Sequence, residues 1–342
     1  MIGVGLIGFG LAGSAFHAPL IEAEPRMRLA AVASSRPDAV RERFPGARVV
    51  PNADALLADP AVDLVVVATP NELHAPLGRA ALVAGKHVVV DKPLVADLAD
   101  GPALLALARE RGRVLTAFHN RRWDGDFLTV RRLLEDGRLG AVALAEFCWD
   151  RFRPMIKRGW REEPAAGAGL LADLGPHLID QALLLFGPPD AVTGDLAAQR
   201  DGAAVDDWFA LVLHYGARRV LLSASTLVAD PRPRFALYGT AGSFVKYGVD
   251  PQEAHLRAGG SVGHPRFGED ADDLRGRLTI GDGPPERVPT ERGDWRRFYA
   301  GVADAILDGA PPPVDPAEAL AGLRLLELAR RSAAEGRTLP LG

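Results

Sequence analysis

The chain has little cysteine, no long apolar run and no block of charges of one sign. Its one cysteine, Cys148, excludes an internal disulfide framework and a cysteine-based zinc site, and it suits a reducing cytoplasm. No apolar run reaches membrane-spanning length, and the strand pattern at the start leaves no room for a signal peptide. The net charge of -4 includes no basic block, which argues against nucleic acid as the main partner. We therefore expect a cytoplasmic protein that binds neither membranes nor nucleic acid and acts on a small molecule.

A glycine-rich turn follows the first apolar run of the sequence. Residues 2–7 lead into the segment Gly8-Phe9-Gly10-Leu11-Ala12-Gly13, and a helix-like segment comes next. Glycines in such a turn let the backbone approach a pyrophosphate, and the helix start supplies amide donors. The next apolar run, residues 29–33, arrives at the spacing of about thirty residues that is typical of a βαβ unit. The pattern predicts a dinucleotide-binding turn rather than a merely tight connection.

The residues after the second strand indicate which nucleotide is bound. An enzyme that prefers NAD usually carries Asp or Glu there, to accept hydrogen bonds from the ribose. This chain has Ser34, Ser35 and Arg36 instead. Hydroxyl groups can donate to the adenosine 2′-phosphate and a guanidinium can pair with it, so the sequence favours NADP(H). The alternative is that the two serines cap the helix that starts at Pro37, with Arg36 in solvent.

Alternating strand and helix patterns continue as far as His119. With 342 residues, of which 48% are hydrophobic, the chain is long enough for two domains. The apolar strands are continuous, as in a parallel sheet with helices on both faces, so we predict an α/β Rossmann domain over residues 1–119. The further strand patterns are residues 64–68, 88–90 and 114–118, and the helix patterns are residues 71–84 and 97–111.

The rest of the chain has a different pattern, with several strands separated by turns. We predict that residues 120–342 form an α+β domain with a large, open and mostly antiparallel sheet. Residues 257–287, rich in glycine, proline and charge, are the best candidate for a mobile loop or an irregular hairpin. The strand patterns are residues 141–150, 191–197, 207–215, 220–226, 235–239 and 242–249, and the helix patterns are residues 127–136, 173–186, 294–307 and 316–336.

One strand of this second sheet is apolar on both faces. The sequence Trp208-Phe209-Ala210-Leu211-Val212-Leu213 does not alternate, although an antiparallel sheet with one wet face should. Both faces must therefore be covered. The domain's own helices can cover one face, and we expect a second copy of the chain to cover the other, in a homodimer or homotetramer.

Chemically useful side chains follow three strands of the predicted parallel sheet, at the edge where ligands bind. A lysine in such a position can donate to a substrate oxygen, although Lys92 could also be an ordinary surface lysine. Thr69 and Asn71 could simply start a helix, and Arg121 and Arg122 could be solvated. The segments concerned are Thr69-Pro70-Asn71 with His74, Asp91-Lys92-Pro93, and Asn120-Arg121-Arg122-Trp123.

Asp173 and His177 are the strongest pair in the second domain. They are four residues apart and lie on one helical face, provided that the helix starts near Asp173 so that Pro176 falls in its first turn. A histidine can take the proton of a hydroxyl group as its hydride departs, and a carboxylate can orient the ring or hold a second hydroxyl. The alternative is an acidic residue at a helix start beside a packed histidine. No third cluster matches the spacing of a metal site, so we predict no metal.

Taken together, these motifs resemble the glucose-fructose oxidoreductase and inositol dehydrogenase (Gfo/Idh/MocA) family over essentially the whole chain. The resemblance implies that Lys92, Asp173 and His177 line the active site, that Lys92-Pro93 is a candidate cis peptide bond, and that the second sheet mediates dimers or tetramers. Asp91 replaces the glutamate of the family motif Glu-Lys-Pro. The motifs are the turn Gly8 to Gly13, Thr69-Pro70-Asn71 with His74, Asp91-Lys92-Pro93, and the block from Gly167 to Asp180.

Within the family, the sequence is similar to the branch that contains NADP-dependent scyllo-inositol dehydrogenases. The resemblance rests on residues 8–19, on Asp91-Lys92-Pro93 and on residues 120–124. It implies an NADP-dependent dehydrogenase or reductase of a cyclic polyol or sugar. Non-catalytic nucleotide-binding regulators and NAD-dependent glycosidases of the same family remain as alternatives. The cofactor residues that we predict are Gly8, Phe9, Gly10, Leu11, Ala12, Ser34, Ser35, Arg36, Thr69, Pro70, Asn71, His74, Asp91, Lys92, Asn120 and Arg121, and the substrate residues are Lys92, Trp123, Trp160, Asp173 and His177, with Phe152, Arg161 and Tyr238 as further candidates for the pocket wall.

Overall fold

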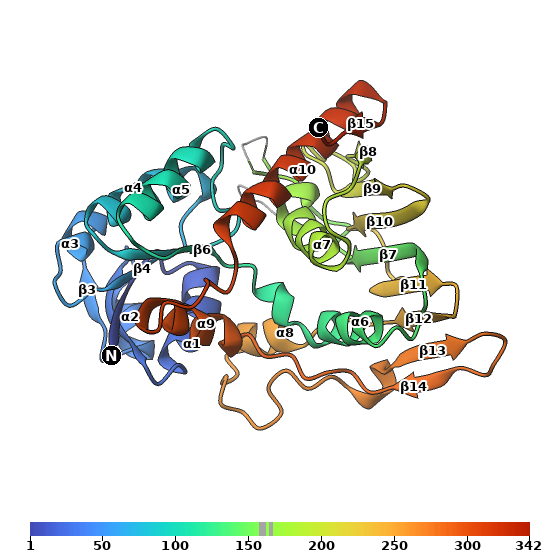
Figure 1. Cartoon of the computed structure of the whole chain (residues 1–342). Coiled ribbons are helices and arrows are strands. Elements are labelled where there is room, and N and C mark those ends of the chain that lie inside the picture. Colours follow the sequence, from blue (N-terminus) through green and yellow to red (C-terminus); the bar gives the residue numbers. More distant parts are fainter. Residues whose placement is uncertain (157–161, 164–166) are drawn as a thin grey trace. The chain divides into compact units, whose positions relative to one another are not determined.

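The chain forms two compact units, seen in a computed structural model that describes residues 1–156, 162–163 and 167–342 (Figure 1). The first unit combines Met1–Trp123 with Gln252–Phe267 and Asp294–Ala321. The second combines Asp124–Pro251 with Gly268–Gly293 and Gly322–Gly342. The predicted division into residues 1–119 and 120–342 places Gln252–Phe267 and Asp294–Ala321 in the second domain, whereas the structure places them in the first unit. Local sequence patterns cannot show that assignment, because it depends on packing between distant segments.

The first unit contains a six-stranded parallel sheet in the order β3-β2-β1-β4-β5-β6. The apolar runs of the sequence form its strands, and those of β1, β4 and β6 are buried throughout because helices lie on both faces (Figure 1). The strands are β1 (Ile2–Ile7), β2 (Met27–Ala33), β3 (Arg48–Val50), β4 (Leu64–Val67), β5 (His87–Val90) and β6 (Leu115–Ala117).

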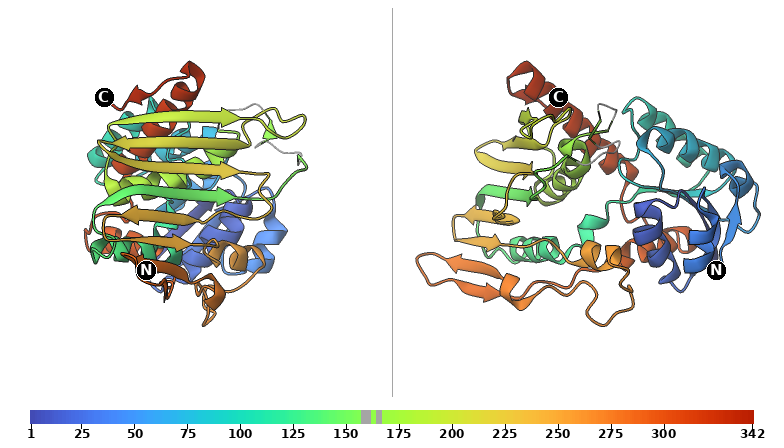
Figure 2. Two further views of the ribbon diagram at one scale, coloured as in Figure 1. Left: turned by 90° about the vertical axis from the view of Figure 1, so that its right-hand side faces the viewer. Right: turned by 180° about the vertical axis from the view of Figure 1, so that it is seen from behind.

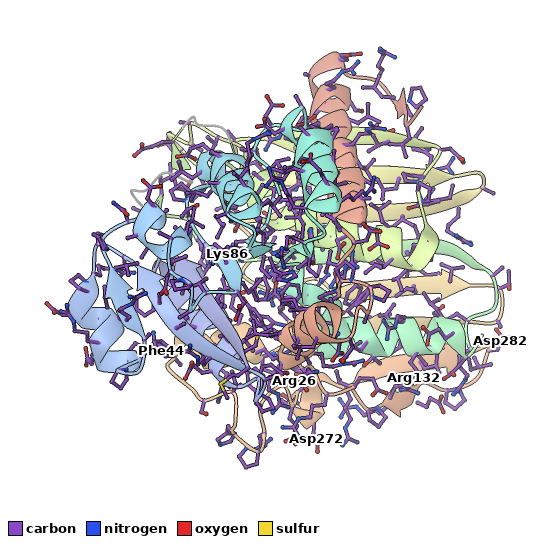
Figure 3. All side chains as sticks on the ribbon, turned by 60° about the vertical axis from the view of Figure 1, so that its left-hand side comes forward. Arg26, Phe44, Lys86, Arg132, Asp272 and Asp282 are labelled. Atoms are coloured by element: carbon purple, nitrogen blue, oxygen red, sulfur yellow. The ribbon has the colours of Figure 1, made fainter. Side chains whose placement is uncertain are left out.

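The helices of the first unit include one late in the chain, which packs on the parallel sheet. Phe298 and Val302 of that helix, α9, are fully buried with Val4 of β1. Arg26, labelled in Figure 3, anchors α9 by donating hydrogen bonds to the Asp304 carboxylate at 2.6 Å and to the Ala300 carbonyl at 3.1 Å. The helical segments are η1 (Ala12–His17), α1 (Ala18–Glu22), α2 (Pro37–Arg43), α3 (Ala53–Leu57), η2 (Asn71–Leu73), α4 (His74–Val83), α5 (Asp100–Glu110), η3 (Asn120–Trp123), α8 (Gln252–Arg257) and α9 (Arg296–Leu307).

The second unit contains a nine-stranded sheet in the order β14-β13-β12-β11-β7-β10-β9-β8-β15. Its neighbours pair antiparallel except β7 and β10, which run parallel. Within the segment 257–287 and just beyond it, the structure forms the hairpin of β13 and β14. The strands are β7 (Val142–Asp150), β8 (Ala191–Ala197), β9 (Trp208–Tyr215), β10 (Arg218–Ser225), β11 (Phe235–Gly239), β12 (Gly242–Lys246), β13 (Gly276–Ile280), β14 (Glu286–Val288) and β15 (Leu339–Pro340).

Helices cover one face of the second sheet. Phe209, Leu211 and Leu213 of β9 are fully buried against them. The intervening Ala210 and Val212 are half-buried on the other face, over which no helix of the described residues lies (Figure 2, left). We call this second face the open face. The helical segments of the unit are α6 (Gly125–Glu135), α7 (Leu170–Phe186), η5 (Asp272–Leu274) and most of α10 (Pro316–Glu335).

Helix α7 corrects one expectation, because it starts at Leu170 and not near Asp173. Pro176 therefore lies inside the helix and not in its first turn. The earlier start depends on Asp206, whose carboxylate accepts the Leu171 N–H at 2.6 Å and whose carbonyl accepts the Leu170 N–H at 2.8 Å. A cap that comes from a distant segment leaves no signal in the local sequence.

Candidate active site

The glycine turn after β1 is too tightly enclosed for larger residues at two of its glycines. A Cβ at Gly8, where φ is +97°, would lie 2.3 Å from the carbonyl oxygen of Ala68, and one at Gly13 would lie 2.2 Å from the carbonyl oxygen of Gly8. Such distances are shorter than any van der Waals contact. A Cβ at Gly10, in contrast, would meet nothing within 4 Å. Gly8 and Gly13 are thus required by the fold, and Gly10 leaves the backbone open on the side where a phosphate would approach.

The glycine turn borders an open pocket with a volume of about 380 Å³. The pocket lies at the carboxyl ends of β1, β2 and β4, which is the ligand edge of an open parallel sheet. None of the side chains that line it is acidic. The lining residues are Ile7, Gly8, Phe9, Gly10, Ala33, Ser34, Ser35, Arg36, Pro51, Asn52, Ala53 and Thr69.

Ser34, Ser35 and Arg36 lie in this pocket as a short connection between β2 and α2. The Ser34 hydroxyl accepts the Arg36 N–H at 3.0 Å, and α2 has no side-chain hydrogen bond at its N-cap. The serines therefore do not cap α2, whereas Arg36 is exposed to solvent as that alternative expects. Within the described part of the chain, the Arg36 guanidinium has no hydrogen bond or ion pair, so it can pair with a ligand phosphate without breaking a bond of the fold.

Asn52 is a pocket residue that the sequence analysis missed. It is the N-cap of α3, and its Oδ1 atom accepts the Ala55 N–H at 2.9 Å. This bond leaves the amide NH₂ group as a donor at the rim of the pocket. A signal was present in the sequence, because Asn52 comes two residues after the third strand, but that strand has only three residues and was not predicted.

The Asp91-Lys92-Pro93 segment forms a fixed turn after β5. The Lys92-Pro93 peptide bond is cis, as the family resemblance implies. The Asp91 Oδ1 atom accepts the backbone N–H of Lys92 at 2.8 Å, and the Lys92 side chain is half-buried. None of the three residues lines the pocket beside the glycine turn, so the structure places them farther along the same sheet edge.

His74 connects this turn to the end of β4. Its ring is completely buried, with Nδ1 2.6 Å from the Pro93 carbonyl oxygen and Nε2 3.1 Å from the Thr69 carbonyl oxygen. A neutral imidazole can donate to one of these oxygens and an imidazolium to both. His74 therefore acts on the site by holding two strand-end segments together.

The η3 segment after β6 is also engaged within the first unit. Asn120 and Arg121 are buried, and the Arg121 guanidinium pairs with Glu253 of α8 and lies 4.8 Å from the ring centre of Trp295. Trp123 is half-buried and packs edge-on against Phe298, with ring centres 5.8 Å apart. These contacts anchor α8 and α9 beside the strand ends, and they do not bring Arg121 into the pocket.

Asp173 and His177 lie on α7 in the second unit. His177 is buried, and its ring centre is 6.0 Å from that of Trp149. The Asp173 carboxylate, a quarter of which is exposed, accepts a hydrogen bond from Arg151 at 2.9 Å. Arg151 directly follows β7 and was not predicted as a site residue. This ion pair fixes the orientation of Asp173.

Three further predicted wall residues have different outcomes. Trp160, together with Arg161, lies outside the described residues. Tyr238 lies on the open face of the second sheet, because its neighbour Leu237 is buried under the helices and side chains alternate along a strand. It therefore does not lie on the α7 side of the sheet, and its assignment to the pocket wall was wrong.

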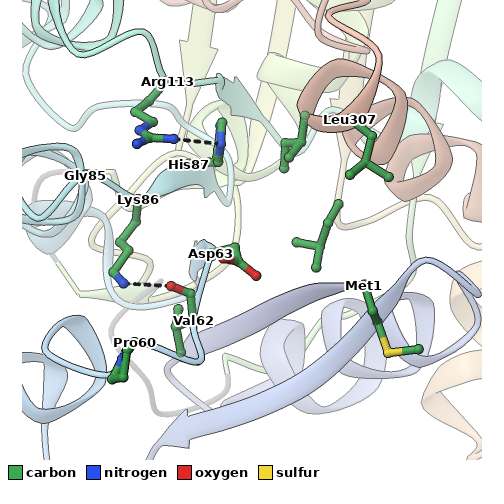
Figure 4. Close-up of a pocket in the computed structure, with 11 residues that line it drawn as sticks. Met1, Pro60, Val62, Asp63, Gly85, Lys86, His87, Arg113 and Leu307 are labelled. Carbon is green, nitrogen blue, oxygen red and sulfur yellow. Dashed lines mark hydrogen bonds between the residues drawn. The ribbon is translucent and has the colours of Figure 1, made fainter.

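A second pocket, at the amino ends of the strands in the first unit, does not look like a ligand site (Figure 4). Lys86 donates to the carbonyls of Asp59 and Val62 at 3.0 and 2.7 Å, and His87 accepts the Val114 N–H at 3.0 Å. The Asp63 carboxylate accepts the Gly3 N–H at 2.8 Å. These polar groups are used to hold strand starts together.

Comparison with known proteins agrees with this architecture. The model of the oxidoreductase family's NAD-binding Rossmann fold, GFO_IDH_MocA, matches residues 2–119, and the model of its C-terminal alpha/beta domain matches residues 131–341. The chain belongs to the Gfo/Idh/MocA oxidoreductase family. In this family member the parallel sheet is thus an NAD(P)-binding Rossmann domain.

Several relatives match almost the full length of this Gfo/Idh/MocA protein. The uncharacterized oxidoreductase YdgJ of Escherichia coli is 45% identical, with 99% of each chain covered. The scyllo-inositol 2-dehydrogenase (NADP(+)) IolW of Bacillus subtilis is 39% identical, with 99% of this chain and 96% of the relative covered. Among solved structures, yvaA of Bacillus subtilis has a TM-score of 0.97 at 39% identity, with 100% and 98% covered, and an oxidoreductase of Bacillus cereus has 0.92 at 34%, with 100% and 99% covered.

Within the described part of the chain, no three His, Cys, Asp or Glu side chains form a cluster that could hold a metal ion. The same residues include no helix with both the length and the apolar character needed to cross a bilayer.

Proposed function

We propose that this protein is an NADP(H)-dependent oxidoreductase that acts on a cyclic polyol or sugar of the scyllo-inositol type. The observation that carries the cofactor preference is the pocket beside the glycine turn, which Ser34, Ser35 and Arg36 line and in which no lining residue is acidic. A carboxylate in this place would repel a 2′-phosphate, and hydroxyl and guanidinium groups attract it. The substrate class is supported by the likeness to IolW over nearly the whole chain.

The bound dinucleotide would supply or accept the hydride at its nicotinamide ring. In this proposal, His177 takes the proton of the substrate hydroxyl on oxidation and returns it on reduction. Lys92 donates a hydrogen bond to the reacting oxygen and stabilises the negative charge that develops there. Asp173, which Arg151 holds at 2.9 Å, accepts a hydrogen bond from a neighbouring hydroxyl or orients the histidine.

The first experiment is an absorbance screen at the wavelength of the reduced nicotinamide. NADP+ and NAD+ are each paired with inositol isomers and common aldoses, and NADPH with the matching keto compounds. Reduction of NADP+ by an inositol, with NAD+ much poorer, is the expected result. A clear preference for NAD+ would contradict the cofactor assignment. Turnover of no compound would contradict the substrate class and favour a non-catalytic regulator.

The assigned roles predict the behaviour of two variants. Lys92→Ala and His177→Ala should each lower kcat by on the order of a hundredfold or more, because each removes a group that acts on the reacting oxygen or its proton. NADPH affinity, measured by fluorescence titration, should remain close to that of the wild type. The matched control is His264→Ala, since His264 is exposed on the surface of the first unit. Unchanged turnover in either active-site variant would remove that residue from the mechanism.

A further inference from the structure

His17 is a completely buried histidine at the end of the π-helical turn η1, and the mechanism above does not use it. Its ring packs against that of Phe118, just after β6, with centres 4.2 Å apart. Single π-helical turns are rare and occur frequently at functional sites. This one places a polar ring underneath the strand ends that carry the Asp91-Lys92-Pro93 turn.

The contacts of the His17 ring bear on its protonation. Nδ1 is 2.7 Å from the hydroxyl oxygen of Tyr299 on α9. Burial, and then the Asp91 charge, raise the pKa of Tyr299 well above its usual value, so the hydroxyl keeps its proton and can donate it to Nδ1 when the ring proton is on Nε2. Burial, opposed by the Asp91 carboxylate and assisted by His74, lowers the pKa of His17 to about 4. The ring is thus neutral near pH 7, and its Nε2–H tautomer is the one that directs a donor toward the Asp91 carboxylate.

The other ring nitrogen, Nε2, faces the turn that carries Lys92. Nε2 is buried, has no hydrogen-bond partner among the described residues and is 4.0 Å from the Asp91 Oδ1 atom. That distance is too long for a hydrogen bond, but a small rotation of the ring or carboxylate would close it. The same Oδ1 atom accepts the Lys92 backbone N–H. A buried N–H without a partner costs free energy, so this geometry favours closure onto the carboxylate.

We propose that His17 is a positioning residue for Lys92. In this proposal, the Tyr299 hydroxyl hydrogen-bonds the ring and the Nε2–H group donates to the Asp91 carboxylate. The carboxylate in turn accepts the Lys92 backbone N–H, which fixes the direction in which the lysine side chain points. This inference rests on the proposed function for its catalytic consequence. Its structural core, the order of the Lys92 amide, does not depend on any substrate.

The low number of lysines makes a direct test of this arrangement feasible. The sequence contains only Lys86, Lys92, Lys157 and Lys246, so ¹⁵N-lysine labelling gives few backbone amide signals. The signal that disappears in the Lys92→Arg variant belongs to Lys92. Hydrogen exchange at Lys92 reports its bond to Asp91. Exchange at Lys86, whose N–H is bonded to the Ala81 carbonyl in the same unit, reports general loosening of that unit.

Two substitutions separate positioning from packing. The His17→Asn amide can reach Tyr299 but not Asp91, and the His17→Gln amide can replace the Nε2 donor. We expect His17→Asn to speed exchange at Lys92 by about tenfold relative to Lys86, as weakening of one hydrogen bond implies, and to lower kcat by a similar factor. His17→Gln should stay close to the wild type in both. In an Asp91→Asn background, His17→Asn should have little further effect.

Equal acceleration at Lys86 and Lys92, or equal losses in the Asn and Gln variants, would show that His17 only fills space and would overturn the proposal. If the wild-type chain turns over no polyol or sugar, the proposed function fails, and the exchange measurement still decides whether His17 orders the Lys92 amide. If the wild type is active and exchange at Lys92 is unchanged in His17→Asn, the positioning role alone fails.

Discussion

At the scale of single residues, the cofactor preference depends on the charge of a few side chains around the glycine turn. Arg36 is the one charged residue among those that line the pocket, and Asn52 adds an amide at its rim. The 2′-phosphate is the only difference between NADP and NAD. A single added negative charge in this place should therefore discriminate between the two dinucleotides through electrostatic repulsion.

Asn52→Asp is the variant that tests this electrostatic dependence. Asp and Asn are about equally good N-caps, so α3 should keep its hydrogen bond to Ala55 while the pocket gains a negative charge. We expect NADPH affinity to fall by about tenfold relative to NADH affinity, with little change in Tm. Fluorescence titration with both dinucleotides measures the ratio. Ala58→Asp, which adds the same charge at the other end of α3, is the control. An unchanged ratio would contradict a role for this rim.

At the scale of elements, the start of α7 shows how a distant residue changes a local prediction. The pattern around Asp173 and Pro176 favours a start near Asp173, because proline belongs in a first helical turn. In the structure the helix begins earlier, at Leu170, since Gly169 adopts a φ of +90° and Asp206 caps the first amides. Asp173 and His177 still share one helical face, because their separation of four residues is unaffected.

Asp206→Ala should destabilise this helix start. The substitution removes the acceptor of the Leu171 N–H and the 3.6 Å contact with Arg330, and it keeps the backbone bond to Leu170. Loss of such a cap costs about 1–2 kcal/mol in the free energy of unfolding, measured by denaturant titration. Asp206→Asn keeps an acceptor oxygen and should lose less. Equal losses in both variants would show that the cap bond is not the cause.

At the scale of the whole molecule, the buried His17 and the half-buried His87 make the free energy of unfolding depend on pH in the acid range. Burial lowers the pKa of His17 to about 4; the Asp91 charge opposes this shift and His74 adds to it. Burial and, after it, the Arg113 charge lower the pKa of His87 to about 4, and the Asp63 charge opposes this shift. Because the unfolded chain takes up protons near pH 6.5 and the fold does not, this contribution is complete above pH 6.5 and is lost as pH falls toward 4.

Tm measured between pH 4.5 and 7 should therefore fall on the acid side. The His17 part of the loss is on the order of 3 kcal/mol at pH 4, because the pKa difference is converted at about 1.4 kcal/mol per unit. His17→Asn has no such titration, so its curve should be shallower than that of the wild type whatever its Tm at pH 7. Parallel curves for the two proteins would show that His17 titrates normally in the fold.

The open face of the second sheet predicts self-association. Its half-buried residues include Leu144, Val212 and Leu221, and described helices cover only the opposite face. Apolar residues on a sheet face without helices are stabilised when a second copy of the same face covers them. We propose that the chain is a homodimer or homotetramer, and that Val212→Glu shifts it toward monomer in size-exclusion chromatography with light scattering. Leu307→Glu, at an exposed leucine of α9, is the control. A monomeric wild type would contradict the proposal.

The sequence by itself determined the two sheets, the glycine turn and the family, because each depends on short-range patterns. Continuous apolar runs form parallel strands, glycines are required where a Cβ would collide with backbone, and Asp173 and His177 share a helical face through spacing alone. Short elements escaped prediction, as β3 did, since three residues carry little periodicity.

Only the tertiary structure decided which distant groups meet. It brought Tyr299 to His17, Asp206 to the start of α7, and Asn52 to the pocket beside Arg36. It also assigned the segments Gln252–Phe267 and Asp294–Ala321 to the nucleotide-binding unit. The physical reason is the same throughout: burial, hydrogen bonding and the resulting pKa values are set by neighbours that are remote in sequence, and no local pattern encodes them.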